Sequence, residues 1–125
     1  MAKSTVQVLQ KLLTYVRTLP EVTERLSHGA PTFFIRHKKS FVMVWPDGHH
    51  DAHFAQLWCA CEPVLRDHLM QDQPAVFFMP PYVGYRGWVG IRFDATSSLD
   101  ELTDVLENAY RLVAPASLVA KLSTP

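Results

Sequence analysis

The hydrophobic pattern of the chain opens with an amphipathic helix. Its apolar residues recur every three or four positions and share one face: Val6, Leu9, Leu12, Leu13, Tyr15 and Val16. Ser4 with Gln7 three residues later predicts a capping box, so we expect the helix to run from Ser4 to about residue 18. Pro20 ends it, and residues 20–26 predict a short amphipathic helical turn with a left-handed cap at Gly29.

Aromatic and β-branched residues replace this helical spacing in the middle of the chain. They predict about five strands, three of them at residues 32–35, 41–45 and 52–58 and two on either side of a loop within residues 76–93. Pro80 and Pro81 must interrupt strand pairing in that loop, and Gly90 marks a bulge or a close approach of the backbone.

Short turns between the strands indicate antiparallel pairing. Residues 37–40 predict a basic hairpin loop, and residues 46–49 predict a proline-led turn with Asp-Gly at its centre. Every aromatic residue except Tyr15 and Tyr110 lies between Phe33 and Phe93, so the sheet should carry most of the core.

Helical spacing returns after the sheet. Ser98 with Glu101 is a second capping box, and the helix that follows, to about residue 113, has the clearest amphipathic pattern. Shorter helices are predicted at residues 62–71 and 116–121. This order predicts an α+β fold of two layers, with helices covering one face of an antiparallel sheet. We expect seven residues among those buried: Trp45, Phe54, Phe78, Trp88, Ile91, Leu102 and Leu106.

Composition adds limits to this picture. The chain has 125 residues, the usual size of one domain, so we expect a single domain over residues 1–125. Twelve Lys and Arg balance twelve Asp and Glu, so no overall field attracts polyanions and a nucleic-acid site would need a local patch. No apolar run approaches the roughly 20 residues that span a bilayer, and no signal-peptide pattern is present, so we expect no membrane partner and a cytoplasmic protein.

The residues that could hold a metal or carry out catalysis do not form a recognisable motif. Cys59 and Cys61 are expected to be reduced thiols, and His49, His50, Asp51 and His53 are typical of a solvated turn. No phosphate loop, nucleophile motif or zinc-protease motif occurs. We therefore expect no metal, no cofactor and no enzymatic activity.

Two loops carry the chemistry that remains. One is basic, with Arg36, Lys38 and Lys39; the other, with its following strand, holds the aromatic and cationic residues Tyr82, Tyr85, Arg86, Trp88 and Arg92. Such residues suit phosphate contact and base stacking. The alternative is that the lysines solvate a turn and the aromatic residues pack. The helix after residue 98 is acidic, so charge should be unevenly distributed.

Four segments, in order and at matching spacing, resemble the MmcQ/YjbR family. They are residues 19–24 (LPEVTE), 29–33 (GAPTF), 82–88 (YVGYRGW) and 110–115 (YRLVAP). The resemblance covers nearly the whole chain and implies a fold similar to CyaY and frataxin.

Proteins of this family are often called DNA-binding, because their hairpins look like a double wing. The resemblance therefore implies a non-enzymatic module with DNA as partner, as a monomer or weak dimer. The alternative is a small-molecule or protein-binding module that uses a pocket between residues 29–31 and the loop 82–88. Candidate lining residues of that pocket are His28, Gly29, Pro31 and Thr32.

Overall fold

The computed structural model describes residues 2–49, 53–93 and 98–122, and these form an α+β domain with one antiparallel sheet. The strands lie in the order β1-β2-β3-β4-β6-β5. They are β1 (Val22–Ser27), β2 (Ala30–Ile35), β3 (Lys39–Trp45), β4 (Gln56–Cys59), β5 (Phe77–Phe78) and β6 (Val89–Arg92). The helices are α1 (Ala2–Thr18), α2 (Pro63–Asp72), the single 3-10 turn η1 (Gly84–Arg86), α3 (Leu99–Val113) and α4 (Ala116–Leu122).

The fold class is as expected, but the described sheet has six strands because β1 replaces the predicted helical turn. It pairs with β2 from Val22 opposite Ile35 to Ser27 opposite Ala30. His28 and Gly29 join the two strands with φ of 53° and 80°, the positive values that a type I′ hairpin turn requires. The prediction of a helical turn was wrong because β1 is an edge strand with no buried residue, so it shows no hydrophobic alternation.

The helix starts were predicted with different success. Ser98 Oγ accepts a hydrogen bond from the Glu101 backbone N–H at 3.3 Å, which confirms the cap of α3. The first helix begins at Ala2, so Ser4 lies within it and not at its start. None of the helices in the described ranges combines the length and the hydrophobicity that crossing a lipid bilayer demands.

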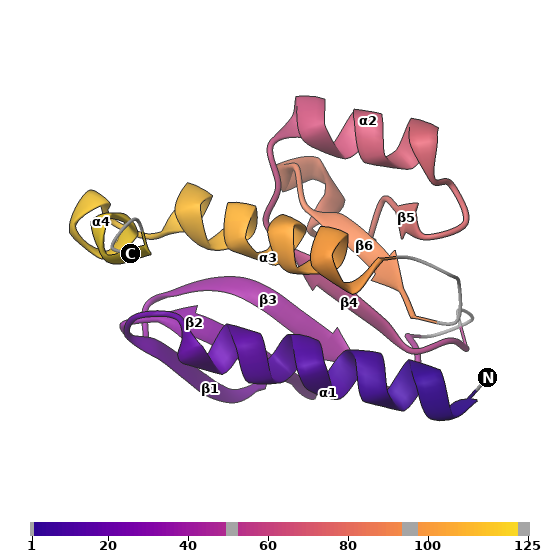
Figure 1. Cartoon of the computed structure of the whole chain (residues 1–125), viewed down its shortest axis with the longest axis horizontal. Helices are drawn as coiled ribbons and strands as arrows, with labels where there is room; N and C mark the ends of the chain where they lie inside the picture. Colours follow the sequence, from indigo (N-terminus) through magenta and orange to yellow (C-terminus); the bar gives the residue numbers. More distant parts are fainter. Residues whose placement is uncertain (1, 50–52, 94–97, 123–125) are drawn as a thin grey trace.

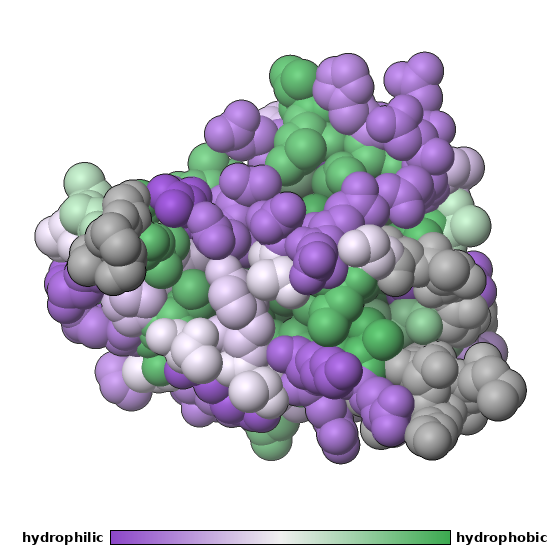
Figure 2. All heavy atoms as spheres, viewed as in Figure 1, coloured by the Kyte–Doolittle hydropathy of each residue, from purple (hydrophilic) through white to green (hydrophobic). Residues whose placement is uncertain are grey.

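Helices α1 and α3 pack side by side on one face of the sheet (Figure 1). The fully buried Tyr110 of α3 meets Phe41 of β3 edge to face, with ring centroids 5.7 Å apart, and its hydroxyl donates to the Pro20 carbonyl at 2.7 Å. From the same side, Figure 2 shows mostly hydrophilic side chains, with apolar atoms in the seam between α1 and α3. The main core therefore lies between these helices and the sheet.

An irregularity between β2 and β3 decides which residues leave this core. Phe33 is opposite Val42 but Phe34 is opposite Ser40, so Phe41 is an extra residue in β3. A bulge of this kind changes which side chains face each side of the sheet. Phe41 packs under α3, while its neighbour Ser40 turns to the opposite side, which we call the open face.

The open face explains which expected core residues are only half-buried. Trp88, Ile91, Leu102 and Leu106 are buried as predicted. Trp45, Phe54 and Phe78 are half-buried because they lie on the open face or at its margin, where neither α1 nor α3 covers them. The close approach predicted at Gly90 is confirmed, because a Cβ there would collide with the ring of Phe78.

Candidate functional site

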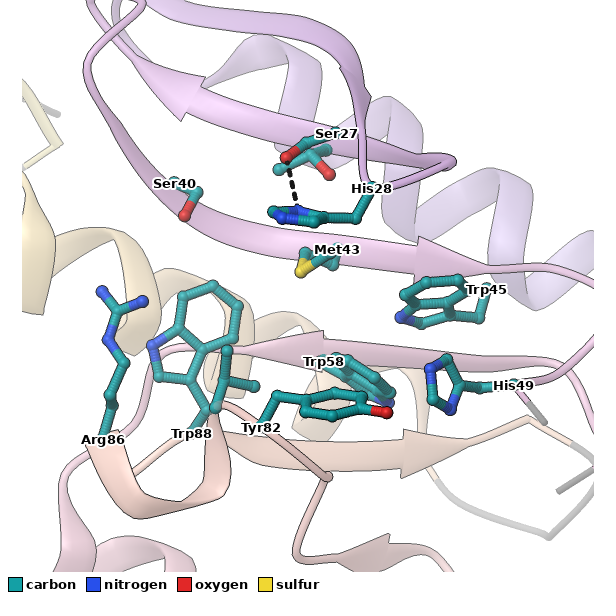
Figure 3. A pocket seen from close by; sticks show the side chains of 12 residues that line it. Ser27, His28, Ser40, Met43, Trp45, His49, Trp58, Tyr82, Arg86 and Trp88 are labelled. Carbon is teal, nitrogen blue, oxygen red and sulfur yellow. Dashed lines mark hydrogen bonds between the residues drawn. The ribbon is translucent and has the colours of Figure 1, made fainter. Parts of the chain in front are cut away.

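The open face of the sheet is hollowed by a cavity of about 510 Å³ (Figure 3). Its floor comes from the strands and their ends: Thr32, Ser40, Met43, Trp45, Trp58 and Trp88. Its rim comes from turns and from the loop 80–88: Ser27, His28, His49, Tyr82, Val83 and Arg86. We refer to these twelve residues together as the hollow. Its size is that of a small-molecule site.

Strand register places the aromatic floor. Met43 is opposite Trp58, and Trp58 is opposite Gly90, so these positions share one face of three adjacent strands. The indole of Trp58 is held by a hydrogen bond from its Nε1 to Gln56 Oε1 at 2.8 Å, and Trp45 lies against it with ring centroids 5.0 Å apart. The floor is therefore a rigid aromatic surface.

Trp45 brings a polar group to this surface. Its Nε1–H is buried and meets no hydrogen-bond acceptor in the part of the chain that the structure describes. In Figure 3 this nitrogen lies on the edge of the ring that faces Met43 and Trp58. A buried donor without an acceptor costs about 1 to 3 kcal/mol of stability. A bound molecule that offered an acceptor to this N–H would remove that cost.

The loop 80–88 forms one side of the hollow, and its backbone is strained there. The Val83 N–H donates to the Pro81 carbonyl at 2.6 Å across Tyr82, whose φ is 64°. A hydrogen bond over two residues around a positive φ is the pattern of the strained classic γ-turn. Backbone strain of this kind is concentrated at binding and catalytic sites.

Arg66 of α2 holds this loop in place. Its Nη1 donates to the Gly84 carbonyl at 2.6 Å and to the Trp88 carbonyl at 3.4 Å. Gly87, with φ of 93°, turns the chain back toward β6. The loop is thus tied to a helix from behind, which fixes Tyr82 and Arg86 at the rim.

Two histidines lie across the rim from each other. The His49 ring lies 4.6 Å from that of Trp45, 4.9 Å from that of Trp58 and 5.8 Å from that of Tyr82, between centroids. At the β1–β2 turn, His28 Nδ1 lies 3.1 Å from Ser27 Oγ. Aromatic rings therefore line the floor and much of the rim.

The hollow is electrostatically one-sided. None of its twelve residues is acidic, and Arg86 supplies the formal positive charge. The Arg86 guanidinium lies 5.5 Å from the centroid of the Trp88 ring and forms no ion pair with a carboxylate of the described residues. A negatively charged group entering the hollow would meet this cation and no carboxylate among the lining residues.

The twelve residues of the hollow include binding groups and one serine–histidine pair. Ser27 and His28 are in contact, and none of the twelve lining residues is a carboxylate that could orient the histidine as in a catalytic triad. Among residues 2–49, 53–93 and 98–122 no three His, Cys, Asp or Glu side chains cluster to hold a metal ion. His50 and Asp51 of the predicted turn lie outside the described residues.

The two cysteines lie in the interior and do not line the hollow. Cys59 and Cys61 are buried free thiols. Burial raises the pKa of the Cys59 thiol well above its usual value and that of Cys61 to about 11. Both thiols therefore stay protonated near neutral pH and are poor nucleophiles.

The structure separates the residues that the sequence grouped as nucleic-acid contacts. Tyr82, Arg86 and Trp88 meet at the hollow, with Tyr85 exposed beside them. Lys38 and Lys39 instead line a shallow surface next to the junction of α3 and α4.

Arg36 lines the same shallow surface as Lys38 and Lys39, whereas Arg92 lies apart from both groups. Arg36 forms two hydrogen bonds to the Glu21 carboxylate, at 3.0 and 3.1 Å. Arg92 stacks 3.9 Å from the Phe54 ring and is in register with Gln56, which is opposite Trp45. Since Lys39 begins β3 and Trp45 ends it, Arg92 lies about 20 Å from the basic hairpin, at about 3.3 Å per residue. One continuous basic surface is therefore not formed.

The predicted pocket between the first hairpin and the loop 82–88 lies where the structure has the hollow. His28 and Thr32 line it, whereas Gly29 and Pro31 do not, because strand alternation turns Pro31 away from Thr32. Sequence reasoning missed the floor residues Ser40, Met43, Trp45 and Trp58. The signal that could have found the aromatic ones is the large number of aromatic residues in the predicted strands. One layer of helices can cover such residues on only one face of the sheet.

Comparisons with known proteins agree with this fold. A family model described as YjbR matches residues 17–112. The crystal structure of a Deinococcus radiodurans protein with a DUF419 domain is similar at a TM-score of 0.71 and 17% identity, covering 94% of this chain and 88% of that one. No curated protein matches the chain.

Proposed function

The chain belongs to the YjbR family, and from this we propose that it is a binding module that takes up a small aromatic molecule in the hollow and does not transform it. The observation that carries the proposal is the hollow itself. It is a concave, mainly aromatic surface, built by strands and loops that are far apart in the sequence. Largely apolar pockets with a few directed polar groups are the usual form of small-molecule sites.

The strained loop supports the same proposal. The two hydrogen bonds from Arg66 hold the loop over the sheet. They do so although the positive φ of Tyr82 makes this backbone conformation higher in free energy than a relaxed one. A preformed site binds more tightly because the loop does not have to be ordered on binding. The absence of a carboxylate from the lining residues supports binding without a chemical step.

Filling the hollow should abolish this binding. Ser40 lies on its floor, and β-strands accept aromatic residues well, so Ser40→Phe should occupy the space without disturbing β3. We expect the neutral probe N-phenyl-1-naphthylamine to bind the parent protein with a micromolar Kd. Ser40→Phe should weaken it at least about tenfold, or about 1.4 kcal/mol. Probe fluorescence titration measures both.

Ser40→Ala is the matched control, because it removes the same hydroxyl and adds no volume. It should bind the probe within about twofold of the parent. The melting temperature of each variant shows whether β3 has been damaged. Equal binding by Ser40→Phe and Ser40→Ala, or no binding by the folded parent, would contradict the proposal.

DNA is the second candidate partner, and one observation favours it. Tyr82 and Tyr85 are 69% and 87% exposed, beside the cation of Arg86, which is an arrangement suited to stacking bases of a single strand. The separation of Arg92 from Lys38 and Lys39 limits the number of phosphates that one strand could contact together. We therefore place DNA after the small molecule.

Tyr85→Ala should weaken single-stranded DNA binding if this second proposal is right. Stacking contributes about 1 to 3 kcal/mol per base, so the Kd measured by fluorescence anisotropy should rise about fivefold or more. Binding should also fall steeply with salt. Leu26→Ala, an exposed apolar residue on β1, is the control. Affinity that changes equally in the two variants would exclude stacking by this loop, and affinity that does not depend on salt would exclude contacts to the phosphates.

A further inference from the structure

We propose that the ligand of the hollow is an aromatic anion whose negative group lies at Arg86 and whose opposite end offers a hydrogen-bond acceptor to Trp45. This inference rests on the proposed function and names its ligand class.

The charge of Arg86 is the first observation. Three other arginines of the fold are neutralised by nearby carboxylates, in the pairs Arg17–Glu24, Arg36–Glu21 and Arg111–Glu107, whereas Arg25 donates to the His37 carbonyl and stacks on Phe34. Arg86 has no such partner among the described carboxylates and only stacks on Trp88. A guanidinium that already lies along an aromatic ring presents its N–H groups in a fixed plane, which suits a carboxylate, sulfonate or phosphate.

The indole of Trp45 is the second observation. Its buried Nε1–H lacks an acceptor within the described parts of the chain, whereas the neighbouring indole of Trp58 donates to Gln56. The contrast indicates that the sheet could supply an acceptor at this depth but does not supply one to Trp45. An acceptor on a ligand would restore the missing hydrogen bond.

The positions of these two groups set the shape of the ligand. In Figure 3, Arg86 and Trp88 lie at one end of the hollow, and Trp45 and His49 lie at the other. The rings of Tyr82 and Trp58 lie between the two ends. The ligand therefore has a flat apolar body with an anion at one end and an acceptor at the other.

Two probes that share one aromatic body test the anion. 1-Anilinonaphthalene-8-sulfonate carries a sulfonate that N-phenyl-1-naphthylamine lacks. We expect the sulfonate to bind the parent about five- to tenfold more tightly at low salt, because one partly exposed charged contact is added. Arg86→Gln should remove that advantage, so that the two probes bind this variant with equal affinity. Lys11→Gln on α1, which also removes one positive charge, should change neither.

The acceptor is tested by competition against the bound sulfonate probe. 6-Hydroxy-2-naphthoate should displace it at about threefold lower concentration than 2-naphthoate, since its hydroxyl can accept from Trp45 Nε1–H. In Trp45→Phe, the two competitors should displace the probe at equal concentrations. If 6-hydroxy-2-naphthoate still displaces the probe at a lower concentration in Trp45→Phe, the ligand does not offer an acceptor to Trp45.

The outcomes separate this inference from the function on which it rests. If the two probes bind the parent with equal affinity, and also bind Arg86→Gln with equal affinity, the site is a pocket for neutral aromatic molecules. The inference that the ligand is an anion would then be wrong. If the sulfonate binds but Ser40→Phe does not weaken it, the probe binds elsewhere and both proposals fail. Loss of both probes in Arg86→Gln, with an unchanged melting temperature, would make Arg86 a residue that shapes the rim and would also overturn the anion.

Discussion

Replacing Gly87 with alanine should lower the free energy of unfolding by about 2 to 4 kcal/mol. Its φ is 93°, which a residue with a Cβ adopts at a cost of about 1 to 2 kcal/mol. A Cβ would also lie 2.9 Å from the carbonyl oxygen of Cys61, which is backbone and cannot rotate away. The loop or the segment before α2 must shift, and each forms part of a packed structure. Urea unfolding measures the loss.

Gly29 provides the matched control for this substitution. It also has a positive φ, 80°, but a Cβ there meets nothing within 4 Å. Gly29→Ala should therefore cost only the conformational part, about 1 kcal/mol. The difference between the two variants isolates the collision with Cys61. Equal losses would mean that the chain at Gly87 relaxes freely, and that the loop 80–88 is not fixed as described.

Replacing Arg66 with methionine should lower stability by about 1.5 to 3 kcal/mol and weaken binding in the hollow. The charged group donates to the carbonyls of Gly84 and Trp88, and hydrogen bonds from charged groups contribute about this much. Methionine keeps the aliphatic stem in contact with its neighbours but leaves both carbonyls without this donor. Without it, the loop that carries Tyr82 and Arg86 should lose its fixed position. Chemical denaturation and titration with N-phenyl-1-naphthylamine measure the two effects.

The neighbouring Asp67 is the control for charge. Its Oδ1 lies 3.8 Å from Arg66 Nε, and its side chain is 73% exposed, against 12% for Arg66. Exposed ion pairs contribute little, so Asp67→Asn should change stability by less than about 0.5 kcal/mol and leave probe binding unchanged. A comparable loss in both variants would show that Arg66 acts through its ion pair. An Arg66→Met variant that is destabilised but binds the probe normally would mean that the loop keeps its position without these hydrogen bonds.

Local sequence signals were sufficient where an element depends on its own residues. The spacing of apolar residues from Leu99 to Val113, with Ser98 as cap, predicted α3 because helical packing faces and caps are set within a few turns. The turn at residues 46–48, where Gly48 has φ of 95°, was likewise predicted from its Pro-Asp-Gly sequence. The four family-like segments indicated the family and the fold class for the same reason, because they are local strings at fixed spacing.

Elements that depend on a distant partner were predicted less well. β1 forms because β2 offers it a full row of backbone hydrogen bonds, and its own exposed side chains give no strand pattern. The bulge at Phe41 depends on the pairing of β2 with β3, and it changes which residues of β3 face the helices. The sequence therefore assigned Trp45 to the core, although it lies half-buried on the open face.

The sequence by itself determined the order of the elements, the two-layer α+β class, the family resemblance and the presence of aromatic and cationic residues in the loop 80–88. Only the tertiary structure decided that Trp58 and Trp45 form the floor beneath that loop, that none of the twelve residues lining the hollow with Arg86 is acidic, and that Arg92 lies far from Lys39. The physical reason is that helix faces, caps and turns are set by neighbours in the chain. A hollow, by contrast, is set by strand register, by a bulge and by hydrogen bonds such as those from Arg66, which join residues far apart in the sequence.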